Sequence, residues 1–143
     1  MTTATLRIVS YNVNDYRRST QDTEREQHSL LADLAADMLC LQEIWDDTND
    51  LTRLYRHFGA IATALEMSGG PVPGRRSHCH MAVLWRPEFA RLSWRTHELS
   101  LWQGIGVAEL GVGAAMSLRV AVTHMARGIP GSDSATWQVI GRR

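Results

Sequence analysis

Three polar residues stand at the ends of segments that are expected to be β-strands. Asn12 ends the first such segment, Glu43 follows the second, and His124 closes the last. Ligand-binding groups commonly collect at the carboxyl ends of strands in α/β folds. Mg²⁺ is bound through one or two carboxylates and keeps several waters, so one glutamate assisted by an amide is a chemically suitable site. A nearby histidine can hydrogen-bond a phosphate oxygen or transfer a proton.

A metal ion in such a place can polarise a phosphoryl oxygen and stabilise the charge that develops during displacement.

Each of the three residues also has an ordinary structural interpretation. An asparagine after a strand is usually a turn residue, and a glutamate in that place is usually solvated. His124 has the same strand parity as Val120 and Val122, so it also fits a histidine at the edge of the core. Taken singly, the three residues leave the chemistry open.

The first part of the chain alternates between strand and helix patterns. Residues 6–11 are rich in β-formers and predict a strand. Thr23 and Glu26 match a capping box, which predicts the start of a helix. Residues 38–41 are apolar at every position, as in a strand covered on both faces. This order favours an α/β class. The apolar positions on the expected helical face are Leu30, Leu31, Leu34 and Ala35.

A second helix is expected next, with Asp47 or Thr48 as its cap and Gly59 closing it. A short strand is predicted at residues 61–65. The glycine and proline content of residues 67–79 predicts a long loop. The apolar positions of the second helix are Leu51, Leu54, Tyr55 and Phe58.

Several strands are predicted in the remainder of the chain. Residues 80–85 are apolar on both faces, whereas residues 91–95 alternate. Residues 106–112 and 118–123 predict a hairpin joined through Gly113. A short final helix is expected to have Ser132 or Asp133 as its cap, with Trp137 and Ile140 as apolar positions.

The composition is that of an ordinary globular domain. Fifteen arginines balance fifteen acidic residues, so the formal net charge is zero. This neutrality disfavours a protein that depends on long-range attraction to nucleic acid, although a nuclease with local contacts remains compatible with it. Two cysteines are too few for a disulfide framework, and no secretory signal or membrane-spanning apolar run is present in the sequence. The expected location is the cytoplasm.

Three segments form a recognisable set: residues 6–13 (Leu-Arg-Ile-Val-Ser-Tyr-Asn-Val), 37–43 (Asp-Met-Leu-Cys-Leu-Gln-Glu) and 120–125 (Val-Ala-Val-Thr-His-Met). Together they resemble the endonuclease/exonuclease/phosphatase superfamily, which includes deoxyribonucleases, sphingomyelinases and inositol-polyphosphate phosphatases. In that family the first strand ends in Asn, the second ends in Leu-Gln-Glu, and a later strand often ends in Thr-His-Leu. Met125 replaces the last leucine here.

The resemblance implies a metal-dependent phosphodiesterase or phosphatase. Glu43 is expected to ligate Mg²⁺ (or Mn²⁺), Asn12 to support the metal or the scissile phosphate, and His124 to contact the phosphate as a catalytic residue. The implied substrate is a phosphodiester or phosphate ester in a nucleic acid, phospholipid or phosphoinositide. The implied fold is half of a four-layer α/β sandwich, with one mixed, mostly antiparallel sheet and helices on one face.

The sequence departs from the family after the Thr-His strand. The family's later Gly-Asp-x-Asn and Ser-Asp-His motifs do not occur, and Ser132-Asp133-Ser134 lacks the histidine. In the family these segments supply an aspartate that orients the attacking water, a histidine that contacts the phosphate, and the second sheet. Residues 1–143 are therefore expected to form one truncated domain that is incomplete as an enzyme. The alternative is a non-catalytic half-domain that binds a partner chain.

If the second sheet is missing, apolar residues in segments 81–85 and 118–122 should be uncovered, and self-association through them is expected. Two other groups of residues have weaker functional interpretations. The run His78-Cys79-His80 offers zinc ligands, but consecutive residues of an extended chain point in opposite directions. Arg75 and Arg76 could hold a phosphate, although a solvated pair in a loop is the ordinary interpretation.

Overall fold

The computed structural model describes residues 5–13, 21–44, 51–73, 80–98, 104–112, 116–123 and 139–142. Its elements in chain order are β1 (Ile8–Asn12), α1 (Gln21–Asp33), β2 (Met38–Gln42), α2 (Leu51–Ala64), β3 (Ser68–Val72), β4 (Met81–Trp85), β5 (Ala90–Glu98), β6 (Gly104–Val112), β7 (Met116–Thr123) and β8 (Val139–Arg142).

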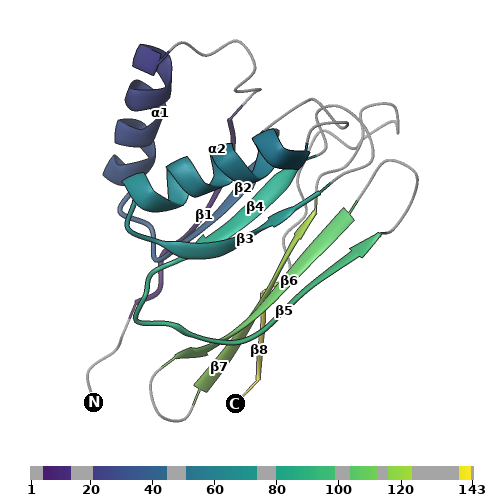
Figure 1. Ribbon diagram of the computed structural model, residues 1–143. Helices are drawn as coiled ribbons and strands as arrows, with labels where there is room; N and C mark the ends of the chain where they lie inside the picture. The colour runs from purple at the N-terminus through teal and green to yellow at the C-terminus, as the bar shows by residue number, and fades with distance from the viewer. Residues whose placement is uncertain are drawn as a thin grey trace, which may run out of the picture.

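These elements form two four-stranded sheets that pack face to face. The first sheet has the order β1-β2-β4-β3, and the second has the order β5-β6-β7-β8. Strands β1 and β2 are parallel, whereas β4 runs antiparallel to both of its neighbours. Helices α1 and α2 lie on the outer face of the first sheet (Figure 1). The mixed α/β class with helices on one face is thus confirmed.

The second sheet is the main difference from the expected single-sheet half-domain. The predicted strands at 91–95, 106–112 and 118–123 belong to this second sheet, as β5, β6 and β7. They pair in antiparallel fashion, and β6 and β7 form the expected hairpin. Because the second sheet covers the first, the apolar side chains expected to be exposed are buried: all of β4 is buried, and so are Leu118, Val120 and Val122. The prediction that these segments are uncovered, which was the reason for expecting self-association, was therefore wrong.

The continuous apolar run of β2 reflects two different cores on its two faces. Leu39 and Leu41 pack with the helices, whereas Met38 and Cys40 pack between the two sheets. All of these side chains are almost completely buried. Burial raises the pKa of the Cys40 thiol to about 12, so this cysteine behaves as a small hydrophobic residue.

The two sheets approach closely where Trp94 of β5 packs over glycines. A Cβ at Gly70 would lie 2.4 Å from Trp94 Cε2, and a Cβ at Gly106 would lie 2.8 Å from Trp94 Cη2. The Trp94 ring also lies 6.2 Å from the ring of Trp85. The loop predicted at 67–79 was wrong in its first part, because Ser68–Val72 form strand β3. Gly70 of this strand leaves room for the Trp94 indole.

Helix α1 begins two residues before the predicted cap. Thr23 lies inside the helix, which starts at Gln21, so the capping-box interpretation was wrong. The predicted apolar face was also only partly correct, since Leu31 is buried while Leu30 is 44% exposed. Ala35 lies beyond the helix with a φ of 45°, and its N–H donates to the carbonyl of Ala32 over 3.0 Å.

Helix α2 continues past Gly59, the residue expected to end it, and includes residues 61–64 of the segment predicted as a strand at 61–65. It ends in a Schellman motif around Glu66, whose φ is 53°. The Glu66 N–H donates to Thr63 O (3.2 Å) and the next N–H, of Met67, donates to Ala62 O (2.9 Å). The buried residues of the helix are Leu54, His57 and Ile61, whereas Leu51 and Tyr55 are exposed.

The segment at the end of the chain is a strand instead of the expected helix. Ile140 belongs to β8 and pairs with Arg119 of β7. The other residues expected in that helix (Ser132, Asp133 and Trp137) and the expected α2 caps (Asp47 and Thr48) lie outside the described residues.

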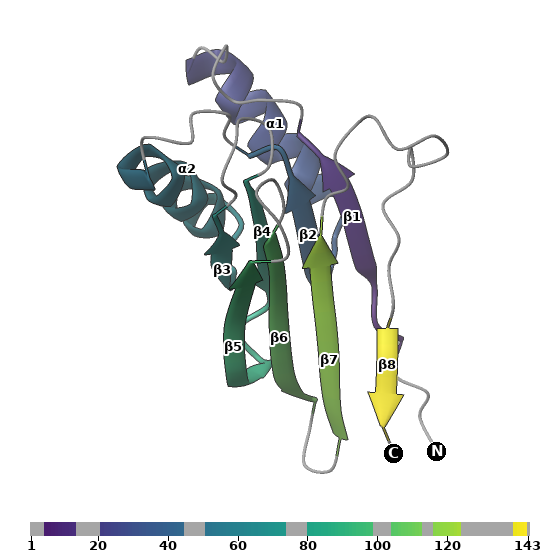
Figure 2. The same cartoon turned by 90° about the vertical axis from the view of Figure 1, so that its right-hand side faces the viewer.

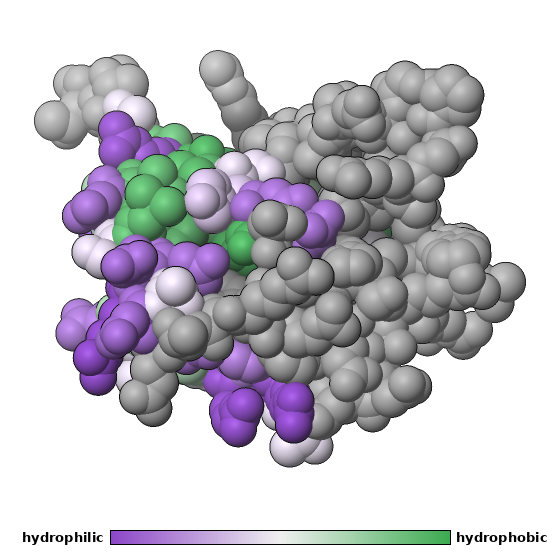
Figure 3. Space-filling model, turned by 90° about the horizontal axis from the view of Figure 1, so that it is seen from above, coloured by the Kyte–Doolittle hydropathy of each residue, from purple (hydrophilic) through white to green (hydrophobic). Residues whose placement is uncertain are grey.

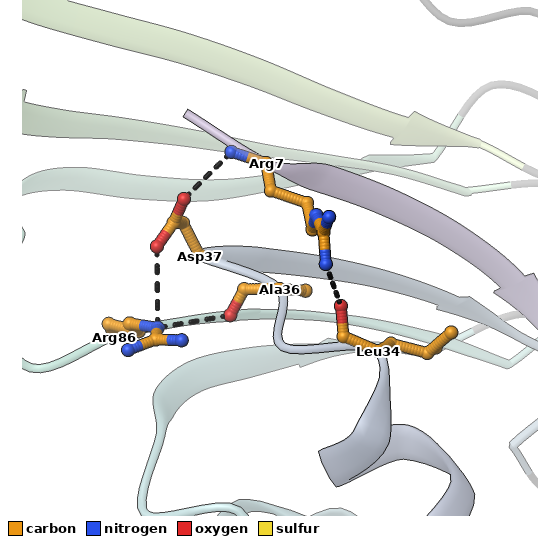
Figure 4. Close-up of polar contacts among 5 residues, drawn as sticks. All are labelled: Arg7, Leu34, Ala36, Asp37 and Arg86. Carbon is orange, nitrogen blue, oxygen red and sulfur yellow. Dashed lines mark hydrogen bonds and ion pairs between the residues drawn. The ribbon is translucent and has the colours of Figure 1, made fainter. Parts of the chain in front are cut away.

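A polar cluster joins the start of β2 to the elements around it (Figure 4). The Asp37 carboxylate accepts from the backbone N–H of Arg7 (2.7 Å) and pairs with Arg86 Nε (3.3 Å). The two arginines also donate to carbonyls of the turn after α1: Arg7 to Leu34 (3.0 Å) and Arg86 to Ala36 (3.2 Å). This cluster fixes the turn that leads from α1 into the buried strand β2.

His57 is buried where α2 contacts α1, and its Nδ1 lies 3.8 Å from a carboxylate oxygen of Glu24. Burial lowers the pKa of His57 and also the pKa of His28, and the Glu24 charge opposes both shifts. The positive groups that lower the pKa of His57 further are Arg56, Arg53 and His28.

Acidification should therefore destabilise the domain. A histidine whose pKa is lowered by folding binds its proton more readily in the unfolded state, so its contribution to stability is complete above the unfolded pKa of about 6.5 and is lost as the pH falls below it. We expect His57→Leu to reduce this pH dependence, as measured by urea unfolding across the range. His97→Gln, at an exposed position of β5, is the control and should leave the dependence unchanged. An increase in stability on acidification would contradict the burial of His57.

Candidate functional site

The structure brings two of the three predicted site residues together. Asn12 is the last residue of β1 and pairs with Gln42, the residue before Glu43. The N–H of Val13 donates to Gln42 O over 3.0 Å, which continues the parallel pairing beyond the strand end. Asn12 is exposed and Glu43 is half-buried. Both side chains therefore lie at one edge of the first sheet.

Glu43 has a backbone conformation that is unusual for its residue type. Its φ of 54° lies in the left-handed region, which glycine adopts readily and other residues adopt at a cost. The next residue is held by a hydrogen bond from Ile44 N to His80 O (3.1 Å). Strained residues of this kind concentrate at functional sites, where the surrounding structure maintains the conformation.

Two buried polar residues lie beside Glu43: Gln42, which had no role assigned from the sequence, and His80, which was considered only as a possible zinc ligand. Gln42 is 3% exposed, and its amide nitrogen donates to Ser10 Oγ (3.2 Å) and to Cys40 O (3.1 Å). His80 is fully buried next to Ile44 at the start of β4. The signal for Gln42 was its place in the Leu-Gln-Glu motif, and the signal for His80 was a polar residue directly before a fully apolar strand.

The third predicted residue, His124, lies outside the described residues and directly follows the end of β7. Strands β1, β2 and β7 all end on the same side of the sandwich (Figure 2). Thr123, the last residue of β7, donates its hydroxyl hydrogen to Gly104 O over 3.2 Å. Viewed from this side, the described residues show a hydrophobic patch bordered by hydrophilic residues (Figure 3).

The donor set at this edge suits an ion that keeps most of its water. Within the described ranges, no group of three or more His, Cys, Asp or Glu residues is placed to hold a metal. One carboxylate, from Glu43, and one amide, from Asn12, match the requirements of Mg²⁺, which uses few protein ligands and retains several waters. The same pair does not match the four nitrogen or sulfur ligands of a structural zinc site.

We expect Glu43→Gly to be more stable than Glu43→Ala by about 1 kcal/mol, because glycine adopts a positive φ without the cost that a Cβ imposes. Both variants remove the carboxylate, so the difference between their stabilities measures the cost of the left-handed backbone conformation. Urea unfolding of the two variants measures it. A control pair at Glu88, an exposed residue without a positive φ, should show the opposite order. Equal stabilities for the two Glu43 variants would contradict the left-handed backbone.

The comparisons with known proteins agree with this fold. Residues 9–139 match the endonuclease/exonuclease/phosphatase family, so the chain belongs to that family. A crystal structure of TDP2 from D. rerio complexed with single-strand DNA product has a TM-score of 0.63 to this chain at 17% sequence identity. The alignment covers 90% of this chain and 49% of that one, so this chain spans about half the length of its structural relative. The curated proteins that were compared include no match.

Proposed function

We propose that this chain forms the metal-binding part of a hydrolase site of the phosphodiesterase or nuclease type. The observation that carries the proposal is the position of Glu43, which is half-buried at a strand end beside Asn12 in a member of the endonuclease/exonuclease/phosphatase family. Its constrained backbone supports the interpretation, since strain of this kind is retained where function requires it.

In this proposal Glu43 is the charged ligand of a divalent metal ion, and Asn12 supports the ion or the scissile phosphate. His124 contacts the phosphate near the attacking group. A divalent ion held there, which we take to be Mg²⁺, would polarise a phosphoryl oxygen and offset its negative charge. Gln42 holds its place through Ser10 and Cys40, which keeps the strand end before Glu43 in position.

Nucleic acid is the substrate class that we favour. The structural neighbour from D. rerio was crystallised with single-strand DNA product, which supports this choice. The zero net charge implies that binding depends on local contacts near the strand ends and less on long-range attraction. Among the described residues, no helix is long and apolar enough to span a membrane. The expected site of action is the cytoplasm.

A second candidate function is a non-catalytic half-domain that binds a partner chain. It is favoured by one observation: the Gly-Asp-x-Asn and Ser-Asp-His motifs of the family do not occur in the sequence. The two candidates differ in whether the strand-end site binds a metal ion.

The decisive experiment is a calorimetric titration of Mg²⁺ into the native chain and into Glu43→Gln. We expect the substitution to weaken binding on the order of tenfold to a hundredfold, because a charge-assisted contact contributes about 1.5–3 kcal/mol. Glu88→Gln, an exposed substitution at the other end of the first sheet, is the matched control and should bind like the native chain. Equal affinity of the native chain and Glu43→Gln would remove the metal assignment and favour the half-domain.

A further inference from the structure

The outer face of the second sheet contains a hollow of about 340 Å³. This face is turned away from the first sheet and from both helices (Figure 1). The side chains that line the hollow come from three neighbouring strands, β5, β6 and β7, and most of them are polar. They are Ser93, Arg95, His97, Val107, Glu109 and Arg119.

One side of the hollow is fixed by an ion pair. The Arg119 guanidinium lies 3.2 Å from a Glu109 carboxylate oxygen, and the Ser93 hydroxyl lies 3.5 Å from the same oxygen. Glu109 pairs directly with both residues in the antiparallel register. A guanidinium has five N–H donors, so the contact with Glu109 orients Arg119 and leaves other donors available to a ligand.

The other side of the hollow contains a second arginine, Arg95. Arg95 is exposed, and its side chain makes no hydrogen bond or ion pair with the described part of the chain. It pairs across the sheet with Val107, which forms the apolar floor. Arg95 and Arg119 lie on the two strands that flank β6 and are offset by two residues along them, because Arg95 pairs with Val107 and Arg119 pairs with Glu109. Their backbones are therefore about 12 Å apart, a distance that two long side chains can close.

The charges of the hollow favour an anion. Two arginines face one glutamate, so the lining has a net charge of about +1 in a chain whose formal net charge is zero. Guanidinium groups bind phosphate with two parallel hydrogen bonds, and the nearby His97 adds a further donor. The hollow is larger than a lone phosphate requires, since a water occupies about 30 Å³. The apolar Val107 floor can contact an organic group attached to the phosphate.

We propose that this hollow is a binding site for the phosphate group of a small organic phosphate, held between Arg95 and Arg119. Arg95 is the principal contact, because it makes no ion pair with the described residues and is available to the phosphate. Arg119 is the second contact and is oriented by Glu109. The site uses none of the residues proposed for the metal-dependent function, so either proposal can fail without the other.

The test is an NMR titration of the isotope-labelled 143-residue chain in the presence of EDTA, which removes any divalent metal. Three probes are compared: inorganic phosphate, a nucleoside monophosphate and an oligothymidylate. We expect saturable shifts of the Arg95, His97 and Arg119 signals with the nucleoside monophosphate, at a lower concentration than inorganic phosphate requires. Arg95→Gln should weaken this binding about tenfold or more, as for the loss of a charge-assisted hydrogen bond.

Arg91→Gln is the matched control, because Arg91 is an exposed arginine of the same strand that does not line the hollow. It should bind like the native chain. Arg119→Gln is a second variant, which should also weaken binding. The proposal is overturned if none of the probes shifts these signals, if Arg95→Gln and Arg91→Gln bind equally, or if only the oligothymidylate binds. Tighter binding of inorganic phosphate than of the nucleoside monophosphate would overturn the inference that the ligand carries an organic group.

Discussion

Replacing Gly106 with valine should lower the free energy of unfolding on the order of 3 kcal/mol, the upper part of the range for overpacked cores. A Cβ at this position would lie 2.3 Å from Val72 Cγ2, 2.8 Å from Trp94 Cη2 and 3.2 Å from Val122 Cγ1. Val72 and Val122 are fully buried, and the three side chains belong to the core between the two sheets. The added atoms have no space unless the sheets separate.

The matched control is Gly111→Val in the same strand. A Cβ at Gly111 would meet its nearest neighbour at 3.6 Å, which is ordinary contact. Valine is also favoured in strands, so this variant should be as stable as the native chain or slightly more stable. Urea unfolding of the two variants gives the comparison. Equal stability of Gly106→Val and Gly111→Val would mean that the two sheets do not pack through Trp94.

The same glycines explain why part of the first sheet could not be predicted. Gly69, Gly70 and Pro71 have the composition of a turn, yet they lie in β3. Their role depends on a tryptophan more than twenty positions further along the chain, and on the close approach of Val83 O to Gly69. By contrast, β2 and β4 were predicted correctly. A continuous apolar run indicates a strand that is buried on both faces, whichever residues pack against it.

The helix ends were mispredicted for a related reason. Gly59 is the usual type of residue to end a helix, but a Cβ there would meet nothing within 4 Å, and α2 simply continues through it. The actual left-handed positions after the two helices are occupied by Ala35 and Glu66. Tertiary packing, such as the burial of Ile61, determines the length of α2 more strongly than residue preference does.

For the candidate site, the placement of Asn12 and Glu43 at neighbouring strand ends could be predicted, whereas the contacts that support them could not. Asn12 and Glu43 could be placed at one sheet edge because parallel strands bring their carboxyl ends together, and the register of β1 with β2 agrees. The left-handed backbone of Glu43 could not be predicted, since nothing in the residue type favours it. The contacts of Gln42 with Ser10 also depend on the register between two strands that are thirty residues apart in sequence.

The largest effect that we expect concerns catalysis by the chain alone. Phosphoryl transfer is catalysed by positioning and charge stabilisation, through groups that act as a unit. The proposed metal at Glu43 can offset charge, but the family's aspartate that orients the water belongs to a motif that does not occur in this sequence. Losing one such group costs on the order of 10²–10⁴ in rate, and losing two that cooperate leaves little beyond the background. The 143-residue chain should therefore hydrolyse phosphodiesters at close to the uncatalysed rate.

The measurement is an assay with magnesium against plasmid DNA and a chromogenic phosphodiester, with and without a C-terminal fragment from a relative that contains both absent motifs. Addition of the fragment should restore turnover, and the restored activity should disappear when Glu43→Ala replaces the native chain. Glu88→Ala is the control and should be restored like the native chain, because this exposed residue lies at the other end of the first sheet. Robust turnover by the native chain alone, abolished by Glu43→Ala, would show that the catalytic set is complete within these 143 residues and that an acidic residue near the strand ends orients the water in place of the family's aspartate.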